Sequence, residues 1–253
     1  MLAIKLDSEE NDNKGALALA EKLSIPLETD LAQTPELLLG WCEGKLALFS
    51  KDSGPVFIDF VEGKLAHRRQ FGGGKKQPLA RAVGLSSKKT PTIIDATAGM
   101  GRDSFVLASL GCEVKMIERS VVVVALLEDA LDRAQKDEGT FAIADRLSVV
   151  CFDACDYLTK IQAENISADV IYLDPMYPEK RKSAAVKKDM RVLQKLVGPD
   201  QDSPKLLDIA LQVAKHRVVV KRPKSAETLI GPKPDTSISS PNTRYDIYSI
   251  KAI

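Results

Sequence analysis

The segment Asp174-Pro175-Met176-Tyr177-Pro178 places a hydrogen-bond acceptor, an aromatic ring and two rigid prolines within five residues. The carboxylate of Asp174 and the carbonyl of Pro175 can together accept both N–H groups of an exocyclic base amine. Holding both hydrogens pulls the nitrogen toward tetrahedral geometry and aims its lone pair at an electrophile. Tyr177 offers a flat face on which the base can stack. The segment therefore predicts chemistry on a base amine, with Asp174, Pro175 and Tyr177 as catalytic residues.

A glycine-containing loop, DATAGMGRD at residues 95–103, follows an apolar run and opens a helical one. Gly99 and Gly101 permit a tight turn and a close approach of a ligand to the backbone. Dinucleotide oxidoreductases use a similar loop, and Ser104 partly matches the third small residue of their fingerprint. The loop therefore predicts a nucleotide or nucleoside site and leaves two cofactor classes open.

Two charges at the start of the following helix separate those classes. Asp103 would repel a pyrophosphate, but it would attract the ammonium of a methionine moiety, whose carboxylate Arg102 can hold. This electrostatic contrast favours S-adenosylmethionine over a nicotinamide dinucleotide. Its positively charged sulfur is a leaving group for direct in-line displacement, so the sequence predicts no metal.

Acidic residues close three successive expected strands, namely Asp95, Glu118 and Asp153. Glu118 can accept both hydroxyls of a ribose. Asp153 can accept from an adenine amino group, while the N–H of Ala154 donates to a ring nitrogen. Asp95 and Asp153 could instead cap helices, and the glycines could form a plain turn. The shared register of the three strand ends favours an adenosine pocket.

Strands and helices alternate strictly from residue 92 onward. The expected strands lie at residues 92–96, 112–118, 147–154, 168–175 and 216–223. The expected helices lie at residues 103–110, 121–135, 157–161, 184–196 and 204–214. This alternation predicts an α/β fold, a doubly wound and mostly parallel sheet with helices on both faces. The ending RYDIYSIKAI predicts an edge strand, with antiparallel pairing as one option, after a loop rich in Pro, Ser and Gly.

The first part of the chain predicts a small α+β domain. Its strand-like runs, at residues 2–6, 40–50 and 55–66, are separated by turn signals such as Ser53-Gly54-Pro55, and residues 14–23 have helical spacing. A sheet of two or three strands with one helix fits this pattern. We therefore expect an N-terminal domain at residues 1–70 and a cofactor-binding domain at residues 71–253.

The composition bounds the class of protein. The chain of 253 residues is 44% hydrophobic and 28% charged, which suits one good-sized core and a small accessory unit. No apolar run approaches the ~20 residues of a membrane span. The charged start lacks the apolar region of a signal peptide, so we expect a cytoplasmic protein. Four scattered cysteines and two histidines predict neither a zinc site nor disulfides.

Several stretches resemble known enzymes. DPMYP resembles the (Asp/Asn)-Pro-Pro-(Tyr/Phe) motif of methyltransferases that act on exocyclic base amines, with Met176 in place of the second proline. The wider sequence resembles the RsmJ family of small-subunit ribosomal RNA guanine-N2 methyltransferases. The matching stretches are FGGGKKQPLARAVG (71–84), DATAGMGRDSFVLASLG (95–111), IERS (117–120), YLDPMYP (172–178), KSAAVKKDMRVLQKLVGPD (182–200), RVVVKRP (217–223) and RYDIY (244–248).

The resemblance implies a class I S-adenosylmethionine-dependent methyltransferase of Rossmann-like fold. It implies methylation of the exocyclic N2 of one guanine near the 3′ end of 16S rRNA, in the small ribosomal subunit. It also implies cofactor contacts at Arg102-Asp103, Glu118-Arg119, Asp153 to Cys155, and Asp174. The DPMYP motif alone leaves adenine N6 as an equal target, so the choice of guanine rests on the resemblance.

A basic stretch follows the catalytic segment and could grip phosphates beside the target base. The RNA-binding candidates are Lys180, Arg181, Lys182, Lys187, Lys188 and Arg191. Lys221 and Arg222, at the end of the fifth strand, could reach the same RNA-binding rim of the site. The alternative is a solvated helix face. Two other functions stay open, a nicotinamide-dependent oxidoreductase of the same topology and a non-catalytic RNA-binding protein with a vestigial pocket.

Overall fold

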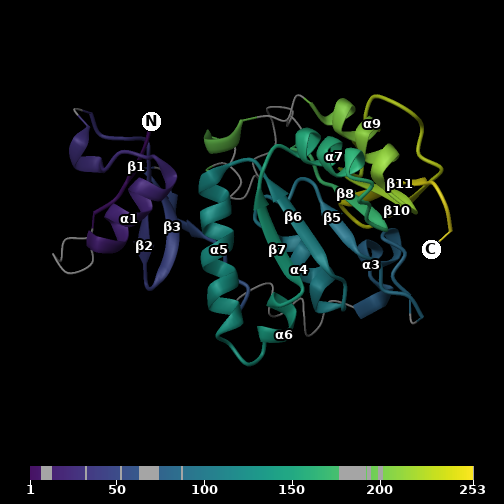
Figure 1. The fold of residues 1–253 in the computed structure, drawn as a ribbon, viewed down its shortest axis with the longest axis horizontal. Coiled ribbons are helices and arrows are strands. Elements are labelled where there is room, and N and C mark those ends of the chain that lie inside the picture. Colours follow the sequence, from purple (N-terminus) through teal and green to yellow (C-terminus); the bar gives the residue numbers. More distant parts are fainter. Residues whose placement is uncertain are drawn as a thin grey trace.

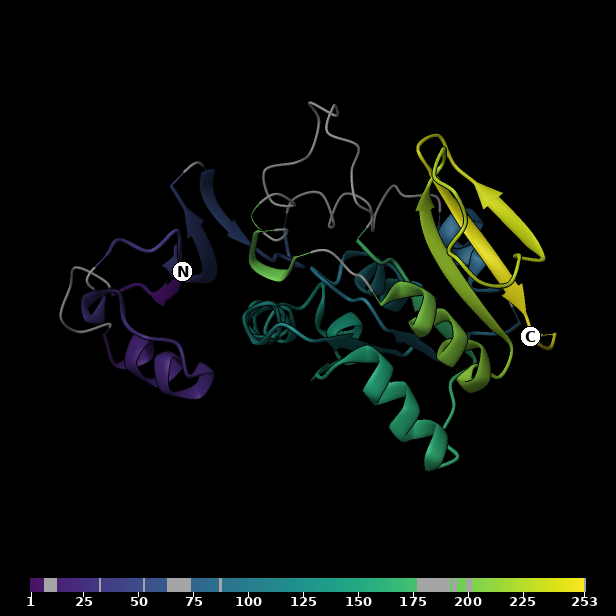
Figure 2. The same ribbon diagram turned by 90° about the horizontal axis from the view of Figure 1, so that it is seen from above.

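The protein forms two β-sheets joined through a shared helix. The computed structural model describes residues 1–6, 13–31, 33–51, 53–62, 74–86, 88–176, 192, 195–198 and 202–252. Within these residues, one sheet has four strands in the order β1-β2-β3-β4, and the other has seven in the order β10-β11-β9-β8-β5-β6-β7. Figures 1 and 2 show the small sheet at the end of the molecule opposite β10 and β11.

Five parallel strands form the centre of the large sheet. They are β5 (Ile93–Asp95), β6 (Val114–Glu118), β7 (Leu147–Cys151), β8 (Val170–Leu173) and β9 (Arg217–Pro223). All four residues of β8 are buried, as expected for an apolar strand covered on both faces. The strand order reverses between β5 and β8, and such a reversal opens a crevice outside the carboxyl ends of the strands.

The last two strands correct one expectation. β11 (Thr243–Ser249) pairs antiparallel with β9, but β10 (Thr236–Ser239) pairs with its other side, so β11 is not an edge strand. Tyr245, Ile247 and Tyr248 of β11 are buried, whereas most of β10 is exposed and polar. The polar strand takes the edge, where unpaired backbone groups meet water.

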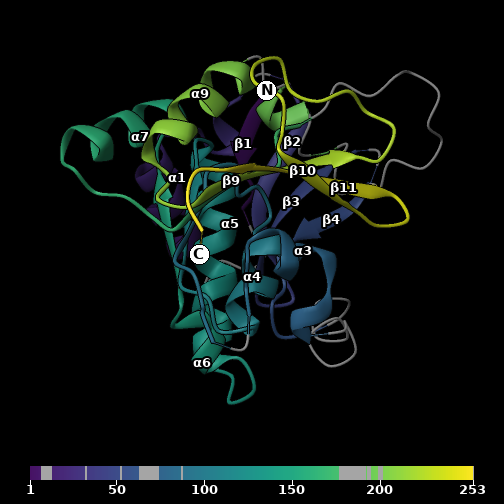
Figure 3. The same cartoon turned by 90° about the vertical axis from the view of Figure 1, so that its right-hand side faces the viewer.

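Helices cover both faces of the large sheet, which confirms the predicted fold class. Figure 3 shows α7 (Ala154–Ala163) and α9 (Ser203–Val213) on one side, with α4 (Arg102–Ser109) and α5 (Val121–Gln135) on the other. Two hydrophobic clusters fill the two sides. α7 begins before the predicted residue 157, because Asp153 caps it, and the short helix α6 (Phe141–Ala144) was not predicted.

The N-terminal sheet has one strand more than expected. Its elements are β1 (Leu2–Ile4), α1 (Asn13–Leu23), the 3-10 turn Glu28–Asp30, β2 (Leu37–Cys42), β3 (Lys45–Ser50) and β4 (Ser53–Phe57). β1 joins in parallel with β2. The expected turn Ser53-Gly54-Pro55 belongs to β4, since an edge strand tolerates a proline that donates no backbone hydrogen bond.

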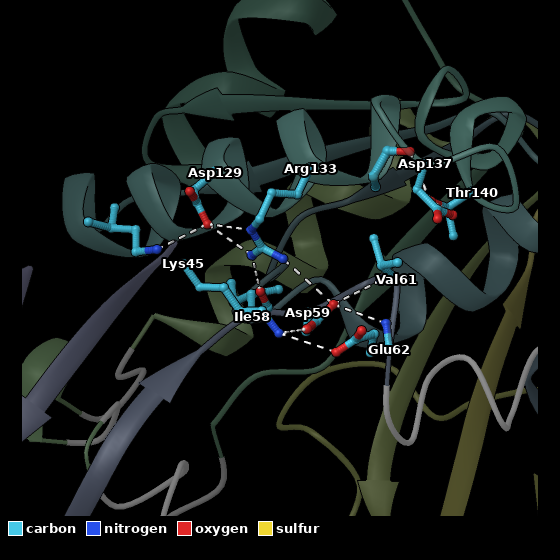
Figure 4. Close-up of polar contacts among 11 residues, drawn as sticks. Lys45, Ile58, Asp59, Val61, Glu62, Asp129, Arg133, Asp137 and Thr140 are labelled. Atoms are coloured by element: carbon cyan, nitrogen blue, oxygen red, sulfur yellow. Dashed lines mark hydrogen bonds and ion pairs between the residues drawn. The ribbon is translucent and has the colours of Figure 1, made fainter. Parts of the chain in front are cut away.

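Helix α5 lies between the two sheets (Figure 1) and contacts β3 on one side and β7 on the other. Arg133 on α5 ties the sheets together in the polar cluster of Figure 4. It donates to the carbonyl of Ile58, pairs with Asp129 at 2.9 Å, and lies 3.6 Å from Asp59. Lys45 Nζ pairs with Asp59 at 2.6 Å. One network therefore fixes the chain as it leaves the small sheet.

The segment after β4 also reaches the glycine loop. The buried ring of Phe60 stacks on Phe105 of α4, with centroids 4.7 Å apart. A short 3-10 turn (Gly74–Lys76) and α3 (Pro78–Ala82) then lead to β5. The expected domain boundary near residue 70 lies outside the described residues and stays a prediction. Among the described residues, no helix is both long and apolar enough to cross a membrane.

Candidate active site

A cavity of about 350 Å³ opens at the carboxyl ends of the central strands. This volume falls within the roughly 300–1,000 Å³ of small-molecule sites. Ten of the residues expected from the sequence line this cavity together: Asp95, Gly99, Arg102, Asp103, Glu118, Arg119, Asp153, Ala154, Asp174 and Pro175. The parallel sheet brings them to one place although they are spread over 80 positions of the chain, from 95 to 175.

Some expected residues lie elsewhere. Cys155 does not line the cavity, and burial raises the pKa of its thiol to about 11. Gly101 does not line the cavity; its φ is +65°, and a Cβ there would come within 2.8 Å of Leu127. Tyr177 and the six RNA-binding candidates, Lys180, Arg181, Lys182, Lys187, Lys188 and Arg191, lie outside the described residues, so their roles stay predictions.

Asp95 holds the glycine loop from inside. Its buried carboxylate accepts from the Ser104 hydroxyl at 2.5 Å and from the backbone N–H of Thr97 at 3.2 Å. Burial raises the pKa of Asp95 to about 7, against the effect of these hydrogen bonds. Ser104 is small because it packs and bonds at this point, which explains its partial match to the dinucleotide fingerprint.

Glu118 joins the second strand end to the loop. Its carboxylate accepts from the backbone N–H of Gly99 at 3.1 Å and from that of Ser120 at 2.8 Å. A carboxylate offers about four acceptor positions, so Glu118 can hold the loop and still accept from ribose hydroxyls. The side chain is only 8% exposed and lines the cavity, so its expected role toward a ribose stays a prediction that this position allows.

Asp153 satisfies both interpretations of the third strand end. It accepts from the backbone N–H of Asp156 at 3.1 Å, as an N-cap does, and it also lines the cavity. The preceding Phe152, together with Ile117 and Leu206, adds apolar walls that suit an adenine ring. The sequence alone did not indicate these three residues, because an apolar side chain beside a strand end carries no signal of its own.

A group of charges occupies the far end of the cavity. Lys221 Nζ lies 2.7 Å from Asp103 Oδ2 and 2.7 Å from Asp174 Oδ2. The Tyr172 hydroxyl donates to Asp103 at 2.8 Å, and the backbone N–H of Asp174 donates to Thr97 Oγ1 at 2.6 Å. Asp103 and Asp174, expected to serve the cofactor and the base, are therefore linked by one lysine.

This arrangement corrects the expectation that Lys221 and Arg222 reach an RNA-binding rim. Lys221 turns into the cavity, and Arg222 is only 6% exposed and donates to the carbonyl of Glu227. Neighbouring residues of a strand point to opposite faces, so Lys221 faces the cavity while Arg222 is buried on the other face. The sequence carried a weak signal, a lysine that directly follows three buried valines.

The charges in this group shift one another's pKa. Burial raises the pKa of Asp174, and Asp103 adds to this effect while Lys221 opposes it. Burial by itself lowers the pKa of Lys221, but Asp174 and Asp103 outweigh it and raise that pKa overall. Lys221 therefore stays a cation at neutral pH.

The remaining wall of the cavity comes from the start of α9 and from Arg102 and Arg119. Arg119 Nη1 lies 3.7 Å from a carboxylate oxygen of Asp202, which precedes α9 and also lines the cavity. The cavity thus combines three kinds of group. Its acidic residues can accept hydrogen bonds from hydroxyls and an ammonium, an arginine can bind a carboxylate, and the apolar walls can hold a base. This set fits the parts of S-adenosylmethionine.

Comparisons with known proteins agree with this chemistry. Residues 19–250 match the family model SAM_MT, described as a SAM-dependent methyltransferase. The chain is 56% identical to ribosomal RNA small subunit methyltransferase J of Hydrogenovibrio crunogenus, over 94% of this chain and 91% of that protein. It is 48% identical to the protein of the same name from Nitrosococcus oceani, over 97% of each. The resemblance to the RsmJ family is thereby confirmed.

A solved structure shows the same fold over nearly the whole chain. The SAM-dependent methyltransferase from Neisseria gonorrhoeae aligns with a TM-score of 0.75 and 32% identity, over 98% of this chain and 96% of that one. The prediction of S-adenosylmethionine as cofactor is confirmed, and the oxidoreductase alternative is set aside. The chain belongs to the family of S-adenosylmethionine-dependent methyltransferases that includes ribosomal RNA small subunit methyltransferase J.

Proposed function

We propose that this enzyme methylates the exocyclic N2 of one guanine near the 3′ end of 16S rRNA, in the small ribosomal subunit. The observation that carries the proposal is the position of Asp174 and Pro175 in the wall of the cofactor cavity. Relatives at 48–56% identity are named ribosomal RNA small subunit methyltransferase J, which supports the RNA substrate. The choice of guanine N2 rests on the resemblance to that family.

The chain's own residues would prepare the amine for attack. Asp174 and the carbonyl of Pro175 would accept hydrogen bonds from its two N–H groups and direct the nitrogen lone pair toward the cofactor. The hydrogen bond from the backbone N–H of Asp174 to Thr97 Oγ1 holds Asp174 against the glycine loop. Bound S-adenosylmethionine supplies the electrophilic methyl group.

The other side chains of the cavity would hold the cofactor. Glu118 accepts from the ribose, while Asp153 and the N–H of Ala154 read the adenine edge. Asp103 attracts the ammonium and Arg102 the carboxylate of the methionine part. A cytoplasmic location, where ribosomal subunits assemble, belongs to the same proposal.

Mass mapping of rRNA tests the target. In cells that lack this protein, we expect one methyl group to disappear from a guanine near the 3′ end of 16S rRNA. A plasmid copy should restore it, and a copy with Asp174→Ala should not. Loss of the methyl group from an adenine would assign adenine N6 instead. Unchanged rRNA would refute the proposal and favour the non-catalytic alternative.

A transfer assay with radiolabelled methyl donor tests the RNA-binding candidates. Lys187→Glu with Lys188→Glu should weaken binding of 30S subunits or naked 16S rRNA and leave cofactor binding intact. The control is Lys88→Glu with Lys89→Glu, an exposed lysine pair that precedes β5 at the opposite ends of the strands. Equal RNA affinity of the two double variants would show that the basic stretch is only solvated.

A further inference from the structure

One cation joins the two functional halves of the cavity. Lys221 Nζ is 2.7 Å from the carboxylate of Asp103, on the cofactor side, and 2.7 Å from that of Asp174, on the base side. Asp103 comes from α4 and Asp174 follows β8, so no local sequence constraint brings them together. Both contacts are charge-assisted hydrogen bonds, the strong class of such interactions.

The sheet itself aims this lysine. The parallel register pairs Val220 of β9 with Leu173 of β8, which sets Lys221 beside Asp174. Val218, Val219 and Val220 are fully buried, so the strand cannot slide or rotate without exposing its core. The Lys221 side chain is 26% exposed, and its charge therefore acts in a partly desolvated site.

The same oxygen of Asp103 serves two donors already, since Oδ2 accepts from both Lys221 and Tyr172. An ammonium of the methionine part that bonds to Asp103 would place a second cation beside Lys221. Like charges at this distance repel in a partly buried site. Among the residues that the structure describes, Asp174 is the second ion-pair partner of the lysine, so the lysine can shift toward Asp174.

We propose that Lys221 is a positioning residue that orients Asp174 for the base amine and competes with the cofactor's ammonium for Asp103. Cofactor binding then shifts the lysine onto Asp174 and completes the base side of the cavity. The role of Asp174 rests on the proposed function, whereas the competition at Asp103 concerns the cofactor alone. The arrangement favours a binding order in which cofactor precedes RNA.

Binding of S-adenosylhomocysteine and of its analogue without the amino group to Lys221→Met tests the competition without RNA. The two ligands differ only in the ammonium that would bond to Asp103. Removing the lysine should therefore raise the preference for S-adenosylhomocysteine over this analogue by ~5-fold or more in calorimetric titrations at pH 8. Lys221→Arg, which keeps the charge, should keep the wild-type preference. Lys215→Met, an exposed site just before β9, is the control.

Turnover tests the orienting role. Lys221→Met should lose methyl transfer by ~10²-fold or more while it still binds the cofactor, and Lys221→Arg should recover most of that loss. If Lys221 had only a structural role, its loss would weaken the binding of both ligands in parallel. The ratio of their affinities would then stay unchanged, which would overturn the inference. Wild-type turnover in Lys221→Met would overturn it as well. If the wild-type protein binds cofactor but transfers no methyl group to RNA, the proposed function fails. The ratio of the two ligand affinities would still show whether Lys221 competes for Asp103.

Discussion

The hydroxyl of Tyr172 donates a 2.8 Å hydrogen bond to Oδ2 of Asp103. Tyr172 is fully buried on β8, two positions before Asp174. Burial raises the pKa of Tyr172 well above its usual value, so the hydroxyl stays a donor. One strand therefore positions Asp174 on the base side of the cavity and holds Asp103 on the cofactor side.

Tyr172→Phe should weaken cofactor binding about tenfold without unfolding the protein, because Asp103 loses one of the donors that hold its carboxylate in place. The ring that fills the core remains. Calorimetric titration with S-adenosylhomocysteine measures the effect. Wild-type affinity in this variant would show that the bond does not orient Asp103.

The control is Tyr248→Phe. The hydroxyl of Tyr248 is buried and has no hydrogen-bond partner among the residues that the structure describes. Its removal should leave cofactor affinity unchanged, and stability should not fall, since a buried polar group without a partner costs free energy.

Asp174→Ala should lower turnover by ~10²-fold or more, as expected for the loss of a positioned acceptor. A methyl-transfer assay with small ribosomal subunits measures the change. Asp156→Ala, at an exposed position on α7, should keep normal turnover. Near-normal turnover of the Asp174 variant would remove that residue from the mechanism.

Gly101→Ala should destabilise the fold more than Gly44→Ala. Both glycines have positive φ, which costs an alanine about 1–2 kcal/mol. A Cβ at Gly101 would also lie 2.8 Å from Leu127 and 3.1 Å from Phe60, and such overlap adds about 1–3 kcal/mol. Nothing lies within 4 Å of a Cβ at Gly44. Urea unfolding of the two variants compares them, and equal losses would contradict the predicted overlap.

The cluster of Figure 4 should contribute stability that depends on pH. Burial raises the pKa of Asp59, but the ion pair with Lys45 and the N–H groups of Glu62 and Val61 outweigh it, so the pKa falls below 3.8. The folded state therefore favours the carboxylate. Its contribution is complete above the ordinary pKa of Asp and is lost as pH falls through the lower folded value.

Asp59→Asn should accordingly lower the free energy of unfolding at neutral pH. On acidification, the free energy of unfolding should fall less in this variant than in the wild-type protein. Urea unfolding at pH 7 and at about pH 3 measures both effects. Asp132→Asn is the matched control, because Asp132 of α5 forms an exposed ion pair with Lys136, the residue that follows the helix. An unchanged pH dependence in Asp59→Asn would show that the cluster does not couple to titration.

The sequence alone determined the sheet and the location of the site. Strict alternation of strands and helices after residue 92 requires parallel strands, and parallel strands bring their carboxyl ends to one edge. Asp95, Glu118, Asp153 and Asp174 all follow or end such strands, so the pattern of the chain is sufficient to predict that they meet. The cofactor class followed from the charges at the start of α4.

Only the tertiary structure decided which side chains face one another across strands. The inward turn of Lys221 depends on the register of β9 against β8, and the internal place of β11 depends on its pairing with β10. The contact of Phe60 with the glycine loop joins residues about 40 positions apart. Register and packing of this kind arise from long-range burial, for which the local pattern of a strand or loop carries no signal.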